Sequence, residues 1–480
     1  MSGKPIYTER DVPGNQGGSD MTTSLTQTSV CLGSSAKGRH GTDPTRREVL
    51  RRLATGAAMV GLADRVRASH GPGKKAGATD ANEQIVIGLV GCGGMGLYNM
   101  EDFKRSPLVR VAAVCDVDAK RMAEAAKKAG GSDVAQYKDY RQMLDRKDID
   151  VIVCATPDHW HGLIGVHALQ AGKDLYIEKP LTHNIKEGRT MVDAARRYGR
   201  IVQVGTQQRS GEHFQRAVAF VRSGKLGKIT WIRTWNYGNI APQGLGNPPD
   251  GAPPPEVDYD MWLGPAPKRP FNKNRFHYEW RYFFDYGGGM VTDWGVHVMD
   301  VALWAMGMRQ PKSISASGGK FGLNDNRDTP DTVEVLYDFG DLIMTYSHRN
   351  CNGRIEHGVH YGTAFHGTEG TLVVNRGGWE VFPETRREGD KDVPRMEGVK
   401  SPTSDQHWPH VKNFIECVRS RKKPIADIED IHISTTVCNL GNIAYLTGRR
   451  IYWDAEKEQI IGDEQANRLT GRVMREPYTL

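Results

Sequence analysis

Three ionisable side chains have the types and positions expected of acid–base chemistry. Lys179 stands between an acid and a proline in IEKPLTHN, directly after residues 173–177, which predict a buried strand. Asp293 and His297 are four residues apart in the helical pattern of residues 290–306, so one helix would place them on the same face. A histidine can exchange a proton near neutral pH, and a neighbouring carboxylate can orient it. We therefore expect Lys179, Asp293 and His297 to be catalytic residues.

Simpler explanations exist for the same side chains. Asp293 and His297 could form a surface ion pair at helical spacing, with the nearby tryptophans in the core. Both are also metal-ligand types, but no third ligand stands at a recognisable spacing, so we expect no metal site. A run of three glycines at residues 287–289, which leaves room for a ligand close to the backbone, favours the catalytic interpretation.

A glycine-rich turn is the first element that could position a ligand for these groups. Residues 84–90 predict a buried strand, GCGGMG follows at residues 91–96, and a helical segment comes next. In this context the first glycine allows the tight turn, the second lets the backbone approach a pyrophosphate, and the last lets helix and strand pack closely. The free N–H groups at the start of the helix would bind phosphate. The candidate cofactor-binding residues here are Gly91, Gly93, Gly94, Met95 and Gly96.

Asp116 ends the second predicted strand, twenty residues after Gly96. An acid at this place would accept hydrogen bonds from the ribose hydroxyls of the adenosine and would repel a 2′-phosphate, so we expect NAD rather than NADP. Asp116 and Asp118 could instead cap the helix that follows them.

Strand and helix patterns alternate from residue 84 to residue 206. Such alternation predicts the α/β class with a parallel, doubly wound sheet, and ligands bind at the carboxyl ends of its strands. Thr156 and Pro157 follow one of these strands, so we expect them at the cofactor site together with Lys179. Strand-like alternation in residues 331–347 and 363–375 predicts an antiparallel sheet in the second half.

Six stretches of the chain resemble the glucose–fructose oxidoreductase / inositol dehydrogenase (Gfo/Idh/MocA) family. They run in the family's order between residues 84 and 453 and read VGCGGMG, ATPDHWHG, YIEKPL, VGTQQR, GGGMVTDWGVHVMD and FHGTEG. The resemblance implies an N-terminal Rossmann domain with a doubly wound parallel sheet. It also implies a C-terminal α+β domain with a large, open, mostly antiparallel sheet that often forms an oligomer interface. We accordingly expect an N-terminal segment at residues 1–80, a dinucleotide domain at 81–206 and a substrate and oligomerisation domain at 207–480.

The resemblance also implies roles for individual residues. Lys179 matches the lysine that reaches the substrate hydroxyl beside the nicotinamide, with Glu178 as a structural or cofactor neighbour. Asp293 and His297 match the family's Asp-x-x-x-His. His161 matches a position that lines the cofactor pocket, although a helix cap at Asp158 explains that stretch equally well. Two late helices are expected to close near the dinucleotide domain and to bring His407 and His410 to the mouth of the site.

The segment between the two halves is rich in proline, glycine and aromatic residues, which excludes long regular elements. Aromatic faces suit sugar rings, and arginine or asparagine suits hydroxyl groups. Packing of an ordered loop onto the sheet would explain the aromatic residues equally well. The candidate substrate-binding residues are Asn236, Arg275, His277, Trp280 and Arg281.

The pair Arg46–Arg47 precedes a short apolar stretch, residues 53–63. Eleven small apolar residues cannot hold a stable membrane span, and paired arginines before a weak apolar core resemble a twin-arginine (Tat) signal. A basic amphipathic helix is the alternative. We expect a protein that folds in the cytoplasm, binds its cofactor there and is exported by the Tat route to the periplasm or elsewhere outside the cytoplasm.

Charge and cysteine content narrow the class of protein further. The net charge of the 480 residues is +7, but residues 1–80 hold twelve Lys/Arg and seven Asp/Glu, a balance of +5, so the rest is nearly neutral and nucleic acid is not an expected partner. The seven cysteines show no CxxC spacing, which argues against a disulfide framework or a zinc ribbon.

The three hypotheses for function follow from these observations. The first is an exported NAD-dependent oxidoreductase that acts on a CH–OH group of a sugar, sugar derivative or cyclitol and forms a dimer or tetramer. The second keeps the fold but cleaves glycosides by transient oxidation and elimination. The third is a non-catalytic exported sugar-binding protein.

Overall fold

The structure, a computed structural model, describes residues 84–480, which lie within one unit, Thr79–Leu480. The predicted N-terminal segment 1–80, with its twin-arginine stretch, lies outside the described residues. In the part of the chain that is described, no helix combines the length and the apolar character that a membrane crossing requires.

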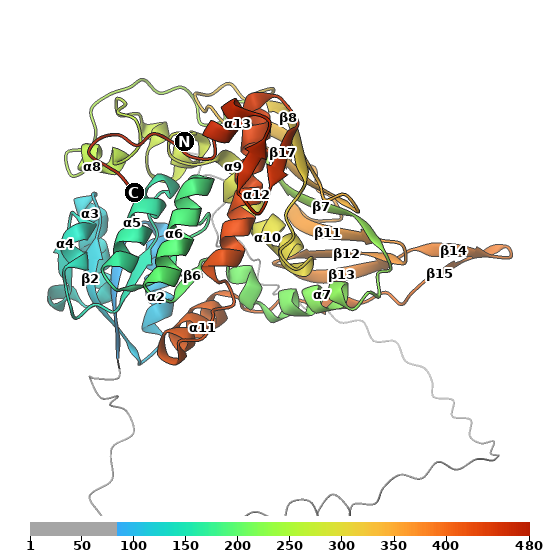
Figure 1. Ribbon diagram of the computed structural model, residues 1–480, viewed down its shortest axis with the longest axis horizontal. Coiled ribbons are helices and arrows are strands. Elements are labelled where there is room, and N and C mark those ends of the chain that lie inside the picture. The colour runs from blue at the N-terminus through green and yellow to red at the C-terminus, as the bar shows by residue number, and fades with distance from the viewer. Residues whose placement is uncertain (1–83) are drawn as a thin grey trace, which may run out of the picture. The chain divides into compact units, whose positions relative to one another are not determined.

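A six-stranded parallel sheet forms the first half of the described chain (Figure 1). The strand order is β3-β2-β1-β4-β5-β6, and every neighbouring pair is parallel. The predicted doubly wound sheet is thus confirmed. The chain order reverses between β1 and β4, and such sheets bind ligands in the crevice at that point, beyond the carboxyl ends of the strands. The strands are β1 (Ile85–Val90), β2 (Val109–Cys115), β3 (Ala135–Tyr137), β4 (Val151–Cys154), β5 (Asp174–Ile177) and β6 (Val202–Val204).

Helices cover both faces of this sheet, which explains why its central strands are apolar throughout. In β1, Ile85, Ile87 and Leu89 face one core while Val86 and Val90 face the other. The first face is covered by α2 (Gly94–Lys104), α3 (Ala119–Ala129) and α11 (His407–Ser420), and the second by α4 (Tyr140–Leu144), α5 (Asp158–Gln170) and α6 (Ile185–Arg197). A short 3-10 turn, η2 (Gly131–Asp133), follows α3.

A ten-stranded sheet dominates the second half. Its order is β16-β13-β12-β11-β7-β10-β9-β8-β17-β18; β7 and β10 pair in parallel, and the other neighbours pair antiparallel. This confirms the predicted large, mostly antiparallel sheet. The strands are β7 (Ile229–Tyr237), β8 (Ser313–Gly319), β9 (Thr332–Asp338), β10 (Ile343–Arg349), β11 (Tyr361–Gly367), β12 (Gly370–Asn375), β13 (Gly378–Pro383), β16 (Lys400–Pro402), β17 (Ile451–Asp454) and β18 (Gln459–Ile461).

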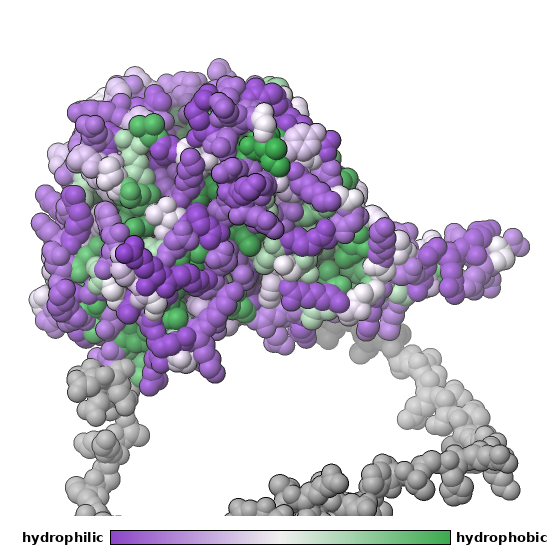
Figure 2. Space-filling view, viewed as in Figure 1, coloured by the Kyte–Doolittle hydropathy of each residue, from purple (hydrophilic) through white to green (hydrophobic). Residues whose placement is uncertain are grey.

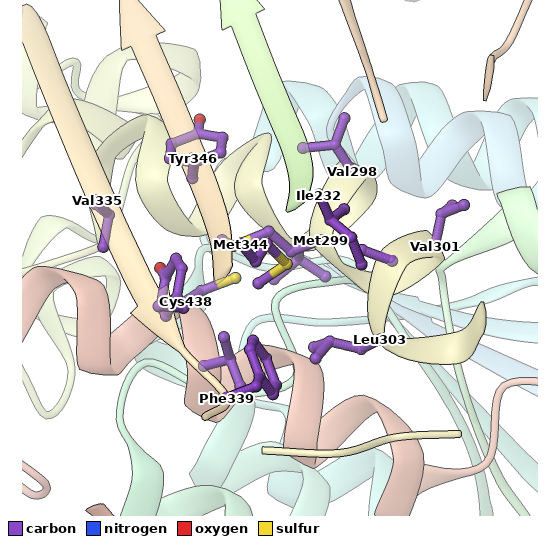
Figure 3. Packing of buried hydrophobic residues seen from close by; sticks show 14 of the residues in the cluster. Ile232, Val298, Met299, Val301, Leu303, Val335, Phe339, Met344, Tyr346 and Cys438 are labelled. Atoms are coloured by element: carbon purple, nitrogen blue, oxygen red, sulfur yellow. The ribbon is translucent and has the colours of Figure 1, made fainter. Parts of the chain in front are cut away.

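One face of the ten-stranded sheet is packed against helices, and the other is open except around a small buried cluster that includes Trp235 and Tyr237. Helices α7 (Glu212–Arg222), α10 (Gly295–Ala305) and α12 (Ile428–Thr447) form a core with the inward side chains, and Figure 3 shows Met299 of α10 and Cys438 of α12 meeting Met344 of β10. Burial alternates along β9, so that Val335 is buried while its neighbour Leu336 is exposed on the open face. This period of two is typical of a sheet with one solvated face.

Two strands form a separate hairpin, β14 (Thr385–Glu388) and β15 (Lys391–Pro394). The hairpin projects beyond the ten-stranded sheet (Figure 1), and Figure 2 shows its surface as hydrophilic. All four residues of β14 are exposed.

Short elements connect the two sheets. The proline- and glycine-rich segment after β7 folds as α8 (Tyr259–Leu263), η4 (Lys273–Arg275), η5 (His277–Tyr282) and α9 (Gly289–Asp293). Its aromatic residues form a small core of their own, with Trp262, Phe276, Trp280 and Tyr286 among its members. Two further short elements are η3 (Gln207–Ser210) and α13 (Glu464–Arg468).

Candidate active site

Lys179 and Asp293 form a nearly buried ion pair between the two halves of the described chain. The Lys179 Nζ donates to Asp293 Oδ1 at 2.8 Å and to the Asp293 carbonyl oxygen at 3.1 Å. Only 11% and 12% of the two side chains are exposed. Lys179 follows the carboxyl end of β5, and Asp293 ends α9, so the structure brings together two predicted site residues that are 114 positions apart.

Arg281 shares the Asp293 carboxylate with Lys179, since its Nε lies 3.2 Å from the same Oδ1. Burial alone would raise the pKa of Asp293, but the two neighbouring cations outweigh it and lower that pKa to about 2. Asp158, at the start of α5, has the opposite outcome: burial and the charge of Asp293 raise its pKa well above the ordinary value, although Arg281 and Lys179 oppose the shift. The site therefore holds one ionised carboxylate and one carboxyl group that favours its neutral form.

His297 lies near this ion pair, but its partners differ from those predicted. Its Nε2 is 3.4 Å from Arg376 Nη2, and its buried Nδ1 has no hydrogen-bond partner among the described residues. Burial lowers the pKa of His297 well below the ordinary value, and the charges of Lys179, Arg376 and His407 lower it further. The imidazole is therefore neutral at pH 7 and able to accept a proton.

The prediction that Asp293 orients His297 is wrong. The pattern of residues 290–306 forms two helices that break at Trp294, and the Asp293 carboxylate binds the two cations described above instead of the imidazole. Asp300, one turn further along α10, is bound by Arg209 and Ser434.

The glycine-rich turn connects β1 to α2 with little free space. Gly91 has a positive φ of 91°, and a Cβ atom on it would lie 2.7 Å from the Ala155 backbone. A Cβ on Gly96 would lie 1.9 Å from the Gly91 carbonyl oxygen, which explains why this helix position has no side chain. α2 begins at Gly94 without a side-chain cap, and the space beside Gly94 is open, so the N–H groups of Gly94 and Met95 remain available to phosphate.

Asp116 binds this turn from the end of β2. Its Oδ2 accepts from the Cys92 N–H at 2.7 Å and its Oδ1 from the Asp118 N–H at 2.9 Å. The helix cap is Asp118, which accepts from the N–H groups of Lys120 and Arg121, so the alternative role for Asp116 does not apply. Each Asp116 oxygen keeps a second lone pair for a ribose hydroxyl. The turn and this acid therefore fit a dinucleotide.

His161 and Glu178 hold the neighbouring strand ends from inside the fold. The ring nitrogens of His161 lie 2.8 Å from the Pro180 carbonyl oxygen and 2.9 Å from that of Thr156, so the ring connects the segments after β4 and β5. The Glu178 carboxylate accepts from Asn99 and Gln207. Thr156 follows β4, and Pro157 immediately precedes α5. The peptide bond between Lys179 and Pro180 is cis.

The five predicted substrate-binding residues do not gather in one place. The Arg281 guanidinium lies over the ring of Trp280 at 4.5 Å, and Arg281 alone of the five contacts Asp293. His277 lies at the start of α3 instead, with Nε2 3.3 Å from Oδ2 of Asp118, which caps that helix. Arg275 pairs with Asp250 in the connecting segment, and Asn236 is buried in β7, where its carbonyl oxygen contacts His348.

Of the two late histidines, only His407 lies toward the site. Its charge lowers the pKa of His297, and its ring meets that of Tyr98 on α2. His410 is fully buried, with its ring nitrogens 2.8 Å from Ser210 Oγ and 2.9 Å from the Val204 carbonyl oxygen. The expectation that His410 approaches the mouth of the site is therefore wrong, because both nitrogens are used to hold α11 against the first sheet.

Arg376 is a site residue that sequence reasoning missed. It occupies the turn between β12 and β13, where no periodic pattern marks it. The motif FHGTEG, which ends six residues earlier, was the nearest signal, but it gives no indication that the following hairpin returns to His297.

Two family models match this chain. One, described as an oxidoreductase family with an NAD-binding Rossmann fold, matches residues 85–206. The other, described as the C-terminal alpha/beta domain of the oxidoreductase family, matches residues 226–349 and 380–480. Together they cover well over half of the chain, which therefore belongs to the Gfo/Idh/MocA oxidoreductase family. The predicted family and the predicted cofactor, NAD, are confirmed.

Individual curated relatives match only part of this chain, at low sequence identity. The uncharacterized oxidoreductase YrbE of Bacillus subtilis is 26% identical over 227 residues, which are 47% of this chain and 54% of that protein. Glycosyl hydrolase family 109 protein 2 of Shewanella sp. (strain ANA-3) is 34% identical over 120 residues, 24% of this chain and 26% of that protein. The chain thus spans about half, or less, of the length of these curated relatives.

A solved structure shares the fold. Levoglucosan dehydrogenase in complex with NADH and levoglucosan superposes with a TM-score of 0.60 at 19% sequence identity, over 77% of this chain and 99% of that one. The predicted fold class is confirmed by this likeness and by the two sheets described above.

Proposed function

We propose that this protein is an NAD-dependent oxidoreductase that transfers a hydride between a hydroxyl-bearing carbon of a sugar, sugar derivative or cyclitol and the nicotinamide. The observation that carries the proposal is the Lys179–Asp293 ion pair near the neutral His297, on the edge of the sheet where the glycine-rich turn lies. The family and its NAD-binding Rossmann fold support this assignment.

Each of these residues has a separate task in the oxidation of a hydroxyl group. His297 is neutral, and because Arg376 can only donate, its unprotonated nitrogen is Nε2, which accepts the hydroxyl proton. Lys179 donates a hydrogen bond to the same oxygen and stabilises its developing negative charge. Asp293 stays ionised and keeps the ammonium group charged and in place. Bound NAD would supply the hydride acceptor.

The substrate class is supported by the residues around Asp293 and by the relatives. Arg281 offers N–H donors beside the ring of Trp280, and such pairs of donors and aromatic faces suit polyhydroxylated rings. The structurally similar levoglucosan dehydrogenase is named for a sugar-derived substrate.

A spectrophotometric screen tests the proposal. Purified protein with NAD is incubated with a panel of sugars, sugar acids and cyclitols, and NADH formation is followed by absorbance. Lys179→Met is compared with Lys412→Met, in which an exposed lysine is removed. We expect turnover that Lys179→Met loses and Lys412→Met keeps. Full turnover in Lys179→Met would refute the assignment.

Cleavage of glycosides is the second candidate, because one relative is named a family 109 glycosyl hydrolase. Oxidation of a ring carbon makes the neighbouring C–H acidic. Elimination can then expel the glycosidic oxygen, and water adds to the resulting double bond. Reduction of the ring ketone by NADH finally regenerates NAD. Incubation with a glycoside separates the two candidates: sugar released without net NADH supports cleavage, and NADH formed with the glycosidic bond intact supports simple oxidation.

We further propose that the open face of the ten-stranded sheet joins copies of this chain in a dimer or tetramer. Leu336 and Ile343 are exposed on that face, with Trp231 partly exposed beside them on β7. Clustered apolar side chains of this kind favour association. Light scattering should give a multiple of the monomer mass, and Leu336→Asp with Ile343→Asp should give the monomer. A monomeric wild-type protein would refute this proposal.

We also propose export by the twin-arginine route, on the basis of Arg46 and Arg47 and the apolar residues that follow. Replacement of both arginines by lysine should retain the protein in the cytoplasm when cells are fractionated. Unchanged distribution would contradict it.

A further inference from the structure

The turn that carries Arg376 is held by hydrogen bonds from two directions. The Arg376 carbonyl oxygen accepts from Thr403 Oγ1 at 2.5 Å. Asn375 Oδ1 accepts from the Gly377 N–H at 2.7 Å, and the Asn375 carbonyl oxygen lies 3.1 Å from a ring nitrogen of His213. The backbone of Arg376 is thus fixed from both sides of the turn, so its side chain starts from a defined position.

The guanidinium group of Arg376 extends from this turn to the His297 side of the site. It lies 5.4 Å from the centre of the Trp294 ring, and its Nη2 is 3.4 Å from His297 Nε2. Its Nε is buried and has no hydrogen-bond partner among the described residues. The ion pairs found in residues 84–480 do not include Arg376. The half-buried Arg376 therefore lies beside an imidazole and keeps N–H donors that no described residue accepts.

Charges in the site are unevenly matched. Lys179 and Arg281 share the single ionised carboxylate of Asp293, while Arg376 has no acid beside it in the described chain. Asp158 does not correct the imbalance, because its carboxyl group favours the neutral form. Lys179, Arg281 and Arg376 thus have one ionised carboxylate among them, and a partly desolvated cation without a counter-charge is unfavourable. An anionic ligand would remove that cost.

We propose that Arg376 recognises an anionic group of the substrate, a carboxylate or a phosphate, so that the substrate is an acidic sugar or cyclitol derivative. The planar guanidinium presents paired N–H donors that match two oxygens of such a group. Because Arg376 lies beside His297, the anionic group binds close to the hydroxyl that His297 deprotonates. This inference rests on the proposed function, since it names the substrate class of the same site.

A purely electrostatic role for Arg376 makes a different prediction. Its positive charge disfavours protonation of His297, and that effect would act on every substrate alike. Loss of the arginine would then shift the acidic limb of the pH–rate profile upward by the same amount for neutral and anionic substrates. Recognition of an anion instead changes the ratio between substrates.

The test compares D-glucuronate, D-glucose 6-phosphate and D-glucose with the NAD-loaded protein. Arg376→Met removes the charge at similar length, Arg376→Lys keeps the charge without the planar fork, and Arg387→Met removes an exposed arginine of the β14–β15 hairpin as a matched control. Both kcat/KM and binding, followed by tryptophan fluorescence, are measured for each sugar.

We expect the wild type to prefer one of the two anionic sugars over glucose. Arg376→Met should lower that preference about 10- to 100-fold, as expected for the loss of a charge-assisted hydrogen bond, with Arg376→Lys between the two and Arg387→Met unchanged. A preference for glucuronate identifies a carboxylate, and a preference for the phosphate identifies a phosphoryl group.

Two outcomes overturn the inference: a wild type that binds neither anion more tightly than glucose, or a preference that survives Arg376→Met. Binding separates this inference from the proposed function. Anion binding that depends on Arg376 without oxidation of any sugar would leave the inference standing and remove the proposed function. Oxidation of neutral sugars with an unchanged preference in Arg376→Met would leave the proposed function standing and remove the inference about Arg376.

Discussion

Two ion-pair networks connect the halves of this molecule, and they differ in how completely their partners are matched. Arg209 and Asp300 are each about 1% exposed, and the guanidinium group binds both oxygens of Asp300, one oxygen of Asp430 and the Ile425 carbonyl oxygen. Lys179, Asp293 and Arg281 are more exposed, at 11%, 12% and 22% of their side chains, and two cations share one carboxylate.

A saturated network stabilises one arrangement of the chain, whereas an unsaturated one leaves donors for a ligand. The comparison therefore separates a structural ion pair from a catalytic one without reference to any motif. It predicts that substitutions in the first network change stability, and that substitutions in the second change catalysis.

The largest effect is expected from Lys179→Met. Because the developing charge on the substrate oxygen would lose its donor, kcat should fall about 10³-fold, or about 4 kcal/mol of activation free energy. Asp293 keeps Arg281 as its partner, so the melting temperature should stay close to that of the wild type. Initial rates and thermal unfolding check both halves of the prediction. A large loss of stability would show that Lys179, like Arg209, mainly stabilises the fold.

Arg209→Met should reduce stability strongly and catalysis only slightly. Removal of one partner leaves the buried Asp300 carboxylate without its counter-charge, so the free energy of unfolding should fall by about 3–5 kcal/mol. Urea unfolding measures this change, and activity per folded molecule should change far less. As a control, Arg209→Met combined with Asp300→Leu removes both charges and should recover part of the stability. A single variant as stable as the wild type would end the comparison.

Acid should reduce the stability of the folded protein. Burial lowers the pKa of His159, His348 and His410 to about 3, 4 and 3, while the unfolded chain titrates near 6.5. The unfolded state therefore binds more protons as the pH falls from 6.5 towards 4, and stability falls with it, by about 1.4 kcal/mol per pH unit for each such histidine. Burial lowers the pKa of His297 as well.

Urea unfolding and initial rates at several pH values between 7.5 and 4.5 test this statement. Stability should fall steadily below pH 6.5, and any titration of His297 in the rate per folded molecule should lie below that pH. Constant stability over that range would contradict it.

The smallest effect is expected from Arg275→Ala. Its ion pair with Asp250 is partly exposed and lies away from Asp293, so the free energy of unfolding should change by less than about 1 kcal/mol. We expect kcat/KM to change less than about 3-fold. Arg281→Ala is the matched contrast and should lower kcat/KM about 10- to 100-fold, because it removes a charged partner of Asp293. Equal effects of the two variants would show that the connecting segment acts as one unit.

The sequence predicted the local parts of this architecture well. The strand, glycine-rich turn and helix around Gly91 and Gly96 are contiguous, so their spacing alone determines how they meet, and Asp116 follows the next strand at the carboxyl edge. Lys179 was found because a strand ends just before it. Each of these predictions needed no knowledge of tertiary contacts.

Partners were harder to predict than positions. Helical spacing suggested that Asp293 binds His297. Its carboxylate instead binds Lys179, which is far away in the sequence, and Arg281, which lies in an irregular segment. Arg376 was missed because its place opposite His297 depends on the order of β11, β12 and β13 in the sheet, which no periodic pattern encodes. His410 was misplaced because a buried histidine and a site histidine look alike in sequence.

Helix α11 has a consequence for how the chain is made. Val411, Phe414 and Ile415 belong to the same core as Ile87 of β1, although more than 300 residues separate them. A nascent chain that has emerged only to residue 206 therefore has α2 and α3 on this side of its first sheet but lacks the cover that α11 provides. The nucleotide-binding half is completed by the last fifth of the polypeptide, so its maturation must wait until translation is almost finished.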